Sequence, residues 1–319
     1  MQRLRPLTVA LSLAALSVLL AAPPRSGAAV TWTSIVAPAR GALDRAIYPV
    51  DGATFVTVRF ATDRVAFHLH VGSLDPPGVS TVPADAQPQI SGWELHLGVV
   101  AAFNSGFQVF SHSGGVWVDG RTLVPLRPGL ATIGIDRFGH LVIGVWGQNL
   151  PRPGFSAIAW RQNLTPLVLG GRITADARGP WYFWGGVVNK QPPEPRSALG
   201  VTANGDVLYT ASMSGVDAAQ LAQALVDAGA ITGLELDINP GWPSLGLAPT
   251  PLTQRSQHFV GGLPGEQRSP NLYLTGSTRD FFVAVLRPPS PCTLATPGVP
   301  RPGAFPQPLR VSGCHFTAP

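Results

Sequence analysis

One segment constrains the fold more than any other: a short capped helix that runs through a glycine into an apolar strand. Asp217 is a good N-cap residue, and Gln220 three positions later completes a capping-box pattern. The apolar residues of 218–225 recur at helical spacing, and Gly229 suits the left-handed position after a helix. A helix that leads directly into a strand favours a mixed fold over a pure β-sandwich. We therefore predict an α+β fold, a β-rich mixed sheet domain with a few packed helices.

Three pairs of apolar, β-rich runs predict hairpins elsewhere in the chain. The paired runs are 54–60 with 65–71, 132–136 with 141–146, and 196–202 with 207–211. Asn204-Gly205 lies between the last two runs. This dipeptide is the strongest short-range hairpin signal, because both residues tolerate positive φ.

The N-terminus has the three-part pattern of an export signal. Arg3 and Arg5 form a basic region, an apolar run of 16 residues spans 7–22, and the small residues Ser26-Gly27-Ala28 precede a cleavage point. We expect residues 1–29 to be a signal peptide and the protein to be secreted or held in the cell envelope. The alternative is an uncleaved anchor, for which the apolar run is short of the ~20 residues that a span requires. Membrane contact is expected only through this signal.

The C-terminus differs in composition from the rest of the chain. Residues 30–287 are expected to form the folded domain, whereas 288–319 are rich in proline and contain both cysteines, Cys292 and Cys314. An even number of cysteines in an exported chain favours a disulfide. We expect an extended tail closed by this disulfide, with two free thiols as the alternative.

Charge and motifs exclude several classes of function. Removal of residues 1–29 takes three of the 22 basic residues and none of the 17 acidic ones, so the net charge falls to +2. That balance, without a basic run, does not support nucleic-acid binding. The sequence has no serine-hydrolase elbow, P-loop, dinucleotide fingerprint or zinc-type cysteine motif. No cofactor is expected, and no sequence feature supports a divalent cation.

His68 and His70 have the spacing of two ligands on one strand face. Only Asp75 or His96 could supply a third ligand nearby. We favour two satisfied structural histidines over a metal site, and expect no metal.

The candidate site is the strand that ends at Asp237, directly before the turn Asn239-Pro240-Gly241. Ligands gather at the carboxyl ends of strands in sheets flanked by helices. Glu235 lies two residues earlier, so the two side chains are expected on the same side of the strand. Two carboxylates at this spacing could act as general acid and as base or nucleophile in glycoside cleavage. The alternative is structural: Asp237 caps the turn and Glu235 makes an edge ion pair.

Four blocks, in order, resemble the phosphodiester glycosidase domain family. The blocks are Val99–Phe107, Gly115–Gly120, Pro195–Thr202, and Gly215–Ala222 with the strand that ends at Asp237. The family includes the enzyme that removes N-acetylglucosamine from a phosphodiester to uncover mannose 6-phosphate. The resemblance implies a phosphodiester glycosidase-like domain over 30–287 and a carbohydrate or glycosyl phosphodiester as partner.

The resemblance also suggests substrate-binding residues. Arg196 matches the arginine of the family, and its planar, always-charged guanidinium suits a phosphodiester or an acidic sugar. Asn104 ends an apolar strand and could hydrogen-bond a sugar or orient a carboxylate, or simply satisfy a turn. Trp242 follows the aspartate closely and is expected to line a cleft.

The chain departs from the family at the aspartate itself. The family continues as Asp-Gly-Gly-Gly-Ser, whereas this chain reads Asp237-Ile-Asn-Pro-Gly241, and Glu235 stands where the family commonly has asparagine. Consecutive glycines let backbone N–H groups converge on a phosphate, but Pro240 has no N–H. Either Asn239 and an arginine supply replacement donors, or the ligand differs, or activity is lost.

Two functions therefore remain open. The first is an exported glycoside hydrolase that cleaves a sugar-1-phosphodiester or a related envelope glycan bond. The alternative is a non-catalytic glycan-binding cell-envelope protein on the same scaffold. The aromatic cluster 179–185 could stack on sugars through Trp181 or Trp184, although core packing is the usual role of such a cluster.

Overall fold

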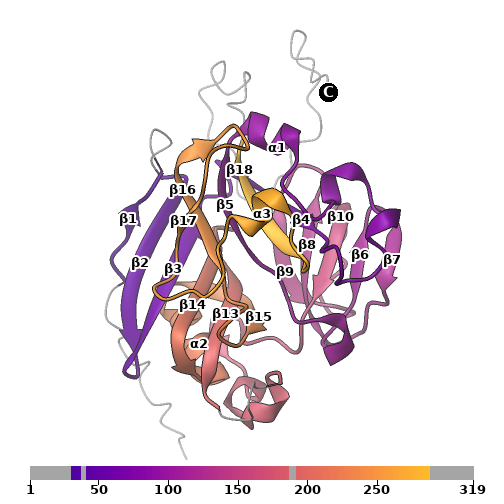
Figure 1. Ribbon diagram of the computed structural model, residues 1–319. Helices are drawn as coiled ribbons and strands as arrows, with labels where there is room; N and C mark the ends of the chain where they lie inside the picture. Colours follow the sequence, from indigo (N-terminus) through magenta and orange to yellow (C-terminus); the bar gives the residue numbers. More distant parts are fainter. Residues whose placement is uncertain (1–29, 37–40, 187–191, 288–319) are drawn as a thin grey trace, which may run out of the picture.

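The computed structural model describes residues 30–36, 41–186 and 192–287. The expected signal peptide, the expected tail and both of its cysteines lie outside these residues. In the described part of the chain the strands form three sheets (Figure 1). The architecture is mostly β with few helices, so the predicted α+β class holds in this coarser form. No helix of the described residues is long and apolar enough to cross a membrane.

The three sheets are antiparallel throughout their described strand pairs. The first has eight strands in the order β1 (Thr33–Ser34), β2 (Leu43–Val50), β3 (Ala53–Phe60), β14 (Val207–Val216), β13 (Glu194–Thr202), β15 (Ala230–Ile238), β11 (Val168–Leu169) and β12 (Arg172–Ile173). The second has five strands: β7 (Arg121–Val124), β6 (Val116–Val118), β10 (Ala157–Gln162), β8 (Ala131–Asp136) and β9 (Leu141–Val145). The third also has five: β17 (Val260–Gly261), β16 (Leu245–Leu252), β5 (Val99–Asn104), β18 (Phe281–Leu286) and β4 (Val65–His70).

The helices of the described residues are short. The α-helices are α1 (Gly92–Leu97), α2 (Ala218–Asp227) and α3 (Leu272–Thr275). The 3-10 helices are η1 (Val79–Thr81), η2 (Ala84–Ala86), η3 (Val109–Ser111), η4 (Asp176–Arg178) and η5 (Trp181–Phe183). The predicted helix is confirmed as α2, with both halves of the capping box between Asp217 and Gln220 in place. Gly229 follows it with φ +97°, the left-handed conformation expected there.

Two of the three predicted hairpins are confirmed, since β8 pairs with β9 and β13 pairs with β14. The first prediction is wrong: β3 pairs with β2 and β14, whereas β4 pairs with β18 in another sheet. Residues 61–64 are therefore a crossing between sheets. The reason is packing, because Phe60 and Phe67 bury their rings against each other, with centroids 5.3 Å apart, in the core that the sheets share.

Strand alternation in the first sheet builds two cores. Leu199 and Tyr209 face the core shared with the other sheets, whereas their neighbours Ala198 and Leu208 belong to the cluster that packs under α2. Figure 1 shows α2 beside β13, β14 and β15. The sheet is thus covered on both faces, which explains why most residues of β13, β14 and β15 are buried, polar ones included.

The sheets meet near the carboxyl ends of β15 and β5. The N–H of Asp237, in β15, donates to the carbonyl oxygen of Ser105 at 2.9 Å, directly after β5. The N–H of Ser105 donates to the carbonyl oxygen of Asp280, directly before β18, at 3.3 Å. Arg161 in β10 of the second sheet also contacts Asp280, at 2.6 Å. Residues from all three sheets therefore converge beside Asp237.

Candidate active site

A β-bulge presents Asp237. Along the β13–β15 pair the register passes from Ala198 opposite Glu235 to Arg196 opposite Ile238, so β15 has one residue more than its partner in this interval. Bulges bend a strand and re-aim side chains, and they are common beside active sites. The hydroxyl of Ser197 donates to the carbonyl oxygen of Asp237 at 2.8 Å, which holds the bulged backbone in place.

Asp237 is buried and pairs with an arginine that the sequence analysis did not single out. Nη2 of Arg279 lies 2.7 Å from its Oδ2, and the N–H of Ile238 donates to its Oδ1 at 2.9 Å. Burial raises the pKa of Asp237 to about 7, because loss of solvent outweighs the opposing effect of the Arg279 guanidinium. A carboxyl group that titrates near neutrality is suited to accept or donate a proton during a reaction.

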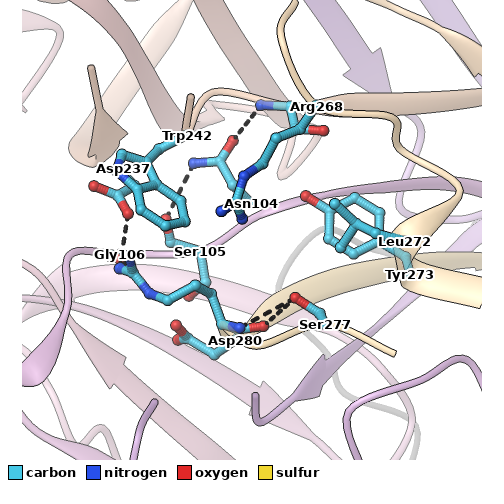
Figure 2. A pocket seen from close by; sticks show the side chains of 12 residues that line it. Asn104, Ser105, Gly106, Asp237, Trp242, Arg268, Leu272, Tyr273, Ser277 and Asp280 are labelled. Atoms are coloured by element: carbon cyan, nitrogen blue, oxygen red, sulfur yellow. Dashed lines mark hydrogen bonds and ion pairs between the residues drawn. The ribbon is translucent and has the colours of Figure 1, made fainter. Parts of the chain in front are cut away.

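A small hollow adjoins this carboxyl group, with a cavity volume of about 20 Å³. Figure 2 shows side chains of Asp237, Asn104, Trp242 and Arg268 converging on it. Other lining residues come from the loop after β5, the turn between β15 and β16, α3 and the loop before β18: Ser105, Gly106, Ser244, Leu272, Tyr273, Ser277, Arg279 and Asp280. A volume of this size accommodates about one water molecule.

Two arginines bracket the indole of Trp242. The guanidinium carbon of Arg268 lies 3.9 Å from the ring centroid, and that of Arg279 lies 4.6 Å from it. Cations over an indole face within about 6 Å are attracted by the ring quadrupole. Trp242 was predicted to line a cleft, and it does line the hollow. The half-buried Arg268 side chain covers the indole of Trp242.

Asn104 also lines the hollow, as part of a hydrogen-bond network. Its Oδ1 accepts from the hydroxyl of Tyr209 at 2.8 Å and from the N–H of Ser244 at 3.1 Å. Its Nδ2 donates to Oγ of Ser197 at 2.9 Å. Since Ser197 in turn holds the backbone of Asp237, Asn104 links the end of β5 to the bulge of β15.

Five buried polar atoms of the lining have no hydrogen-bond partner in the described part of the protein. They are Oγ of Ser105, Oγ of Ser244, Nε and Nη1 of Arg279 and Oδ1 of Asp280, of which Nε of Arg279 lies in the ion pair with Asp75. A buried polar group without a partner costs about 1–3 kcal/mol, so such groups are rare and call for an explanation. A hydroxyl, a cationic donor and a carboxylate acceptor around one hollow form a set that a polar ligand can satisfy.

Glu235 and Arg196 lie together but outside this lining. Oε1 of Glu235 contacts Nη1 of Arg196 at 2.5 Å, with the arginine side chain 1% and the glutamate side chain 0% exposed. Burial raises the pKa of Glu235 to about 7 despite this arginine. Arg196 also donates to the carbonyl oxygens of Val216 and Trp184 at 2.8 and 2.7 Å. The two carboxylates of β15 thus have different arginines, and Asp237 is the one at the hollow.

Asn239 lies in the turn and not in the lining. Its φ of 76° is left-handed, a conformation that asparagine tolerates better than most residues. The N–H of Trp242 closes the turn on the carbonyl oxygen of Asn239 at 3.1 Å, and Nδ2 of Asn239 donates to the carbonyl oxygen of Gly186 at 3.0 Å. The left-handed backbone of Asn239 thus turns the chain toward Trp242, and the Asn239 amide anchors the neighbouring loop.

Part of the chain matches a known protein family. Residues 97–237 match the phosphodiester glycosidase family. The matched stretch contains Asn104, Arg196 and both β15 carboxylates, whereas Trp242 and Arg279 lie beyond it. The resemblance drawn from the four sequence blocks is confirmed.

Solved structures give distant similarity. The catalytic domain of zebrafish N-acetylglucosamine-1-phosphodiester alpha-N-acetylglucosaminidase, auto-inhibited by its pro-peptide, is similar over 82% of this chain and 89% of that chain, at 12% identity and a TM-score of 0.48. A hypothetical protein from Synechocystis is similar over 82% of this chain and 64% of that chain, at 13% identity and a TM-score of 0.47. No curated protein matches the sequence.

Around the candidate site, the sequence analysis missed Arg161, Arg279 and Asp280. Arg161 lies in an otherwise apolar strand, and its Nε contacts Oδ2 of Asp280 at 2.6 Å. Arg279 also has its Nε 3.2 Å from Oδ2 of Asp75. A charged residue within or directly before an apolar strand is a usable signal, because a buried charge requires a partner.

Gly106 is required by the same network. A Cβ atom at this position would lie 3.1 Å from the guanidinium carbon of Arg161. Nη2 of Arg161 donates to the carbonyl oxygen of Phe107 at 2.6 Å, so this guanidinium is held directly against the loop after β5. The Asn-Ser-Gly sequence at 104–106 therefore lets the buried arginine approach the backbone.

His68 and His70 are structural, as the sequence analysis favoured. Both contact Oε1 of Glu94, at 3.0 and 2.8 Å, and Nδ1 of His70 lies 2.6 Å from the carbonyl oxygen of Gln87. Among the described residues, no group of three or more histidine, cysteine, aspartate or glutamate side chains could hold a metal ion.

The two tryptophans that could stack on sugars, Trp181 and Trp184, differ in their exposure to solvent. Trp184 is 1% exposed, and its indole N–H donates to the carbonyl oxygen of Asp176 at 3.0 Å. Trp181 is 41% exposed and lies in η5 beside the exposed Tyr182. Core packing therefore accounts for Trp184, whereas the ring of Trp181 is accessible.

Proposed function

We propose that this protein hydrolyses a glycosidic bond in a sugar-1-phosphodiester or a related envelope glycan, with Asp237 as the proton-transferring group. One observation carries the proposal: a buried carboxyl group with a pKa of about 7 lies beside Arg279, at a polar hollow of a phosphodiester glycosidase domain. Export to the cell envelope is part of the proposal and rests on the N-terminal sequence pattern.

The chemistry requires one base when the leaving group is a phosphate. The Asp237 carboxylate takes a proton from a water molecule as the water oxygen bonds to the anomeric carbon. The bond from that carbon to the phosphate oxygen breaks, and its electron pair leaves with the phosphate as a phosphomonoester. Nη1 of Arg279, which has no hydrogen-bond partner in the described part of the protein, would donate to this anion.

The volume of the hollow limits which part of the reaction it can hold. About 20 Å³ suits the attacking water and not a sugar ring. The sugar would then lie on Trp242, which requires the Arg268 side chain to leave the indole face. Arg268 is half-buried on a loop, so it can move without disturbing a strand. Once displaced, it offers a second cation to the phosphate.

A two-carboxylate form of the mechanism keeps Glu235 as the general acid, with Arg196 and Asn239 positioning the substrate. Most glycosidases use two carboxyl groups. This form requires Glu235 to reach the substrate from its buried position. Replacement of Glu235 and of Asp237 by their amides distinguishes the two forms.

Glycan binding without hydrolysis is the second candidate, and the turn after Asp237 favours it. Pro240 supplies no N–H, and the amide of Asn239 is bonded to Gly186. The turn therefore lacks the anion cradle that consecutive glycines would provide.

The deciding experiment incubates the purified full chain with glycosyl-1-phosphodiesters and with aryl glycosides and follows sugar and phosphomonoester release. Release by the wild-type protein, abolished in a folded Asp237→Asn variant, supports hydrolysis. Saturable binding without any product supports the second candidate. Equal turnover of wild type and Asp237→Asn would remove Asp237 from the mechanism.

A further inference from the structure

A second concave site shares no lining residue with the hollow at Asp237. It is a groove of about 610 Å³ between the segment that precedes α1 and the loop that carries Arg255. Asp85, Gln87, Gln89 and Trp93 contribute to its lining. The volume lies within the ~300–1,000 Å³ that is typical of small-molecule sites. It far exceeds the water-sized hollow at Asp237.

The Trp93 ring in this groove is half-buried and held in place. His68 packs against the indole edge-to-face, with centroids 4.5 Å apart at 61°. His68 is itself fixed by Glu94 at 3.0 Å, and Glu94 closes the capping box at the start of α1. An aromatic ring held in place in this way can bind a ligand without a further cost in side-chain ordering.

The polar groups around Trp93 favour a neutral ligand. Nε2 of Gln87 donates to the carbonyl oxygens of Val79 and Val82 at 3.1 and 3.0 Å, which leaves its Oε1 to accept. Asp85 and Arg255 bring one negative and one positive charge, so the groove has no net field to attract a polyanion. Sugar hydroxyls both donate and accept hydrogen bonds, and they match such a mixed lining.

Hydrogen bonds join the groove to the candidate active site. The N–H of Ile90 donates to the carbonyl oxygen of Tyr273 at 2.9 Å, and the N–H of Ser277 donates to that of Pro88 at 2.7 Å. Nη1 of Arg255 donates to the carbonyl oxygen of Leu274 at 3.1 Å. Since Tyr273 and Ser277 also line the hollow, α3 is the wall between the two sites. Figure 1 shows α1 and α3 close to each other at this end of the molecule.

We propose that the Trp93 groove is a second binding site, and that it takes a neutral sugar ring of an oligosaccharide stacked on the indole. Combined with the proposed function, on which this extension rests, the groove would hold a distal sugar of a glycan whose reacting bond lies at Asp237. A substrate of several sugars would cross α3 between the two sites.

The binding test uses the full chain with ¹⁵N-labelled tryptophan and the neutral probes chitotetraose and mannotetraose. The Trp93 indole resonance is assigned with Trp93→Phe, a variant that keeps an aromatic ring. Saturable movement of this resonance with either probe is expected. In Trp93→Ala the affinity should fall about tenfold, as loss of one stacking contact predicts. Trp32→Ala is the matched control, because Trp32 is also half-buried and also has another side chain, Arg59, packed against its ring.

Each outcome of this titration either supports or overturns the proposed sugar site. A Trp93 resonance that neither probe moves at millimolar concentration overturns the proposal, and so does movement caused by polyphosphate but by neither sugar. If Trp93→Ala does not fold, the double variant Asp85→Ala/Arg255→Ala must weaken binding in its place. Asp237→Asn should bind the probes as the wild type does, because the groove lies outside the hollow.

A kinetic comparison tests the extension separately. If the wild type hydrolyses glycosyl phosphodiesters, Trp93→Ala should raise KM for a tetrasaccharide phosphodiester and leave KM for the monosaccharide one unchanged. Equal KM changes for both would overturn the extension. Absence of wild-type hydrolysis would count against the proposed function alone, because the NMR titration tests sugar binding in the groove without any hydrolysis.

Discussion

Nη2 of Arg279 lies 2.7 Å from Oδ2 of Asp237, yet burial still raises the pKa of this carboxyl group to about 7. Because of the arginine, both the ionised and the protonated form of Asp237 are populated near neutral pH. A base must be ionised to take a proton, and a pKa near the working pH combines a useful ionised fraction with sufficient basicity.

Hydrolysis should depend on pH through Asp237. The carboxylate is the active form, so kcat/KM should rise tenfold per pH unit below about 7 and level off above it. Asp237→Asn should lose about 100-fold or more of the rate, the usual worth of a positioned base. Initial rates from pH 5 to 9 measure both effects. A rate that falls as pH rises through 7 would show that Asp237 acts as an acid.

The same carboxyl group should lower stability as pH rises. The folded pKa of about 7 lies above the unfolded value of 3.8, so the folded state retains a proton that the unfolded state has lost. Between these values the free energy of unfolding should fall by about 1.4 kcal/mol per pH unit because of this group. Urea unfolding of wild type and Asp237→Asn at pH 5 and 7 isolates it, since the other buried carboxyl groups are common to both proteins. Parallel pH dependence of the two proteins would contradict the raised pKa.

The Glu235–Arg196 pair should matter mainly for stability. Arg196→Met leaves Glu235 buried without its partner and should cost about 3–5 kcal/mol, less below pH 7 where the carboxyl group is protonated. Arg196→Met combined with Glu235→Leu should recover part of that loss, because the charge left alone is gone.

Turnover of a Glu235→Gln variant decides between the two forms of the mechanism. Activity should stay within about tenfold of wild type if Glu235 transfers no proton, since a general acid is worth about 100-fold or more. A loss as large as that of Asp237→Asn, in a folded protein, would place Glu235 in the chemistry.

The sequence predicted individual elements better than their arrangement. The capping box of α2 and the Asn-Gly hairpin are local signals, and both are confirmed. The wrong hairpin at 61–64 involves two similar β-rich runs that join different sheets, since β3 pairs with β2 and β14 whereas β4 pairs with β18. Local pattern carries no information about which distant strand a β-strand will pair with.

In the candidate site, too, individual residues were predicted better than their arrangement. Asp237, Asn104 and Trp242 were found because they end strands or follow a turn. The bulge between Glu235 and Ile238 has no sequence signature here, so the separate surroundings of the two carboxylates could not be predicted. Arg279 reaches Asp237 from a segment 42 positions later in the chain, and only the junction between sheets brings them together.

Arg268 should affect charged and uncharged substrates differently. It covers the face of Trp242 at 3.9 Å, so Arg268→Ala should expose the indole and lower KM for aryl glycosides. It should raise KM for glycosyl phosphodiesters about tenfold, because one hydrogen bond to a charged group is lost. Arg137→Ala is the matched control, since Arg137 lies over the ring of Phe138 at 4.7 Å in another part of the protein. Equal KM changes for both substrate types would show that Arg268 does not contact the phosphate.

The pair of His70 and Glu94 should stabilise the fold in a defined pH range. Although burial opposes the charged imidazole, the Glu94 carboxylate raises the pKa of His70, and the histidines hold the pKa of buried Glu94 well below its usual range. The stabilisation from His70 is complete below its unfolded pKa of 6.5 and is lost as pH rises through the higher folded value. That from Glu94 is present above its unfolded pKa of 4.5 and is lost only in stronger acid.

The free energy of unfolding should therefore differ most between wild type and His70→Gln at about pH 5–6.5, by about 3 kcal/mol, and the difference should shrink toward pH 9. Chemical denaturation at pH 6 and pH 9 measures it. His140→Gln is the control, because the His140–Asp136 contact, at 2.9 Å, is nearly as short as the 2.8 Å contact of His70 with Glu94, but the His140 side chain is 40% exposed, where ion pairs contribute little. A His70→Gln effect that is equal at the two pH values would mean that the imidazole is neutral in the folded protein and acts through packing against Phe281 alone, with the ring centroids 4.8 Å apart.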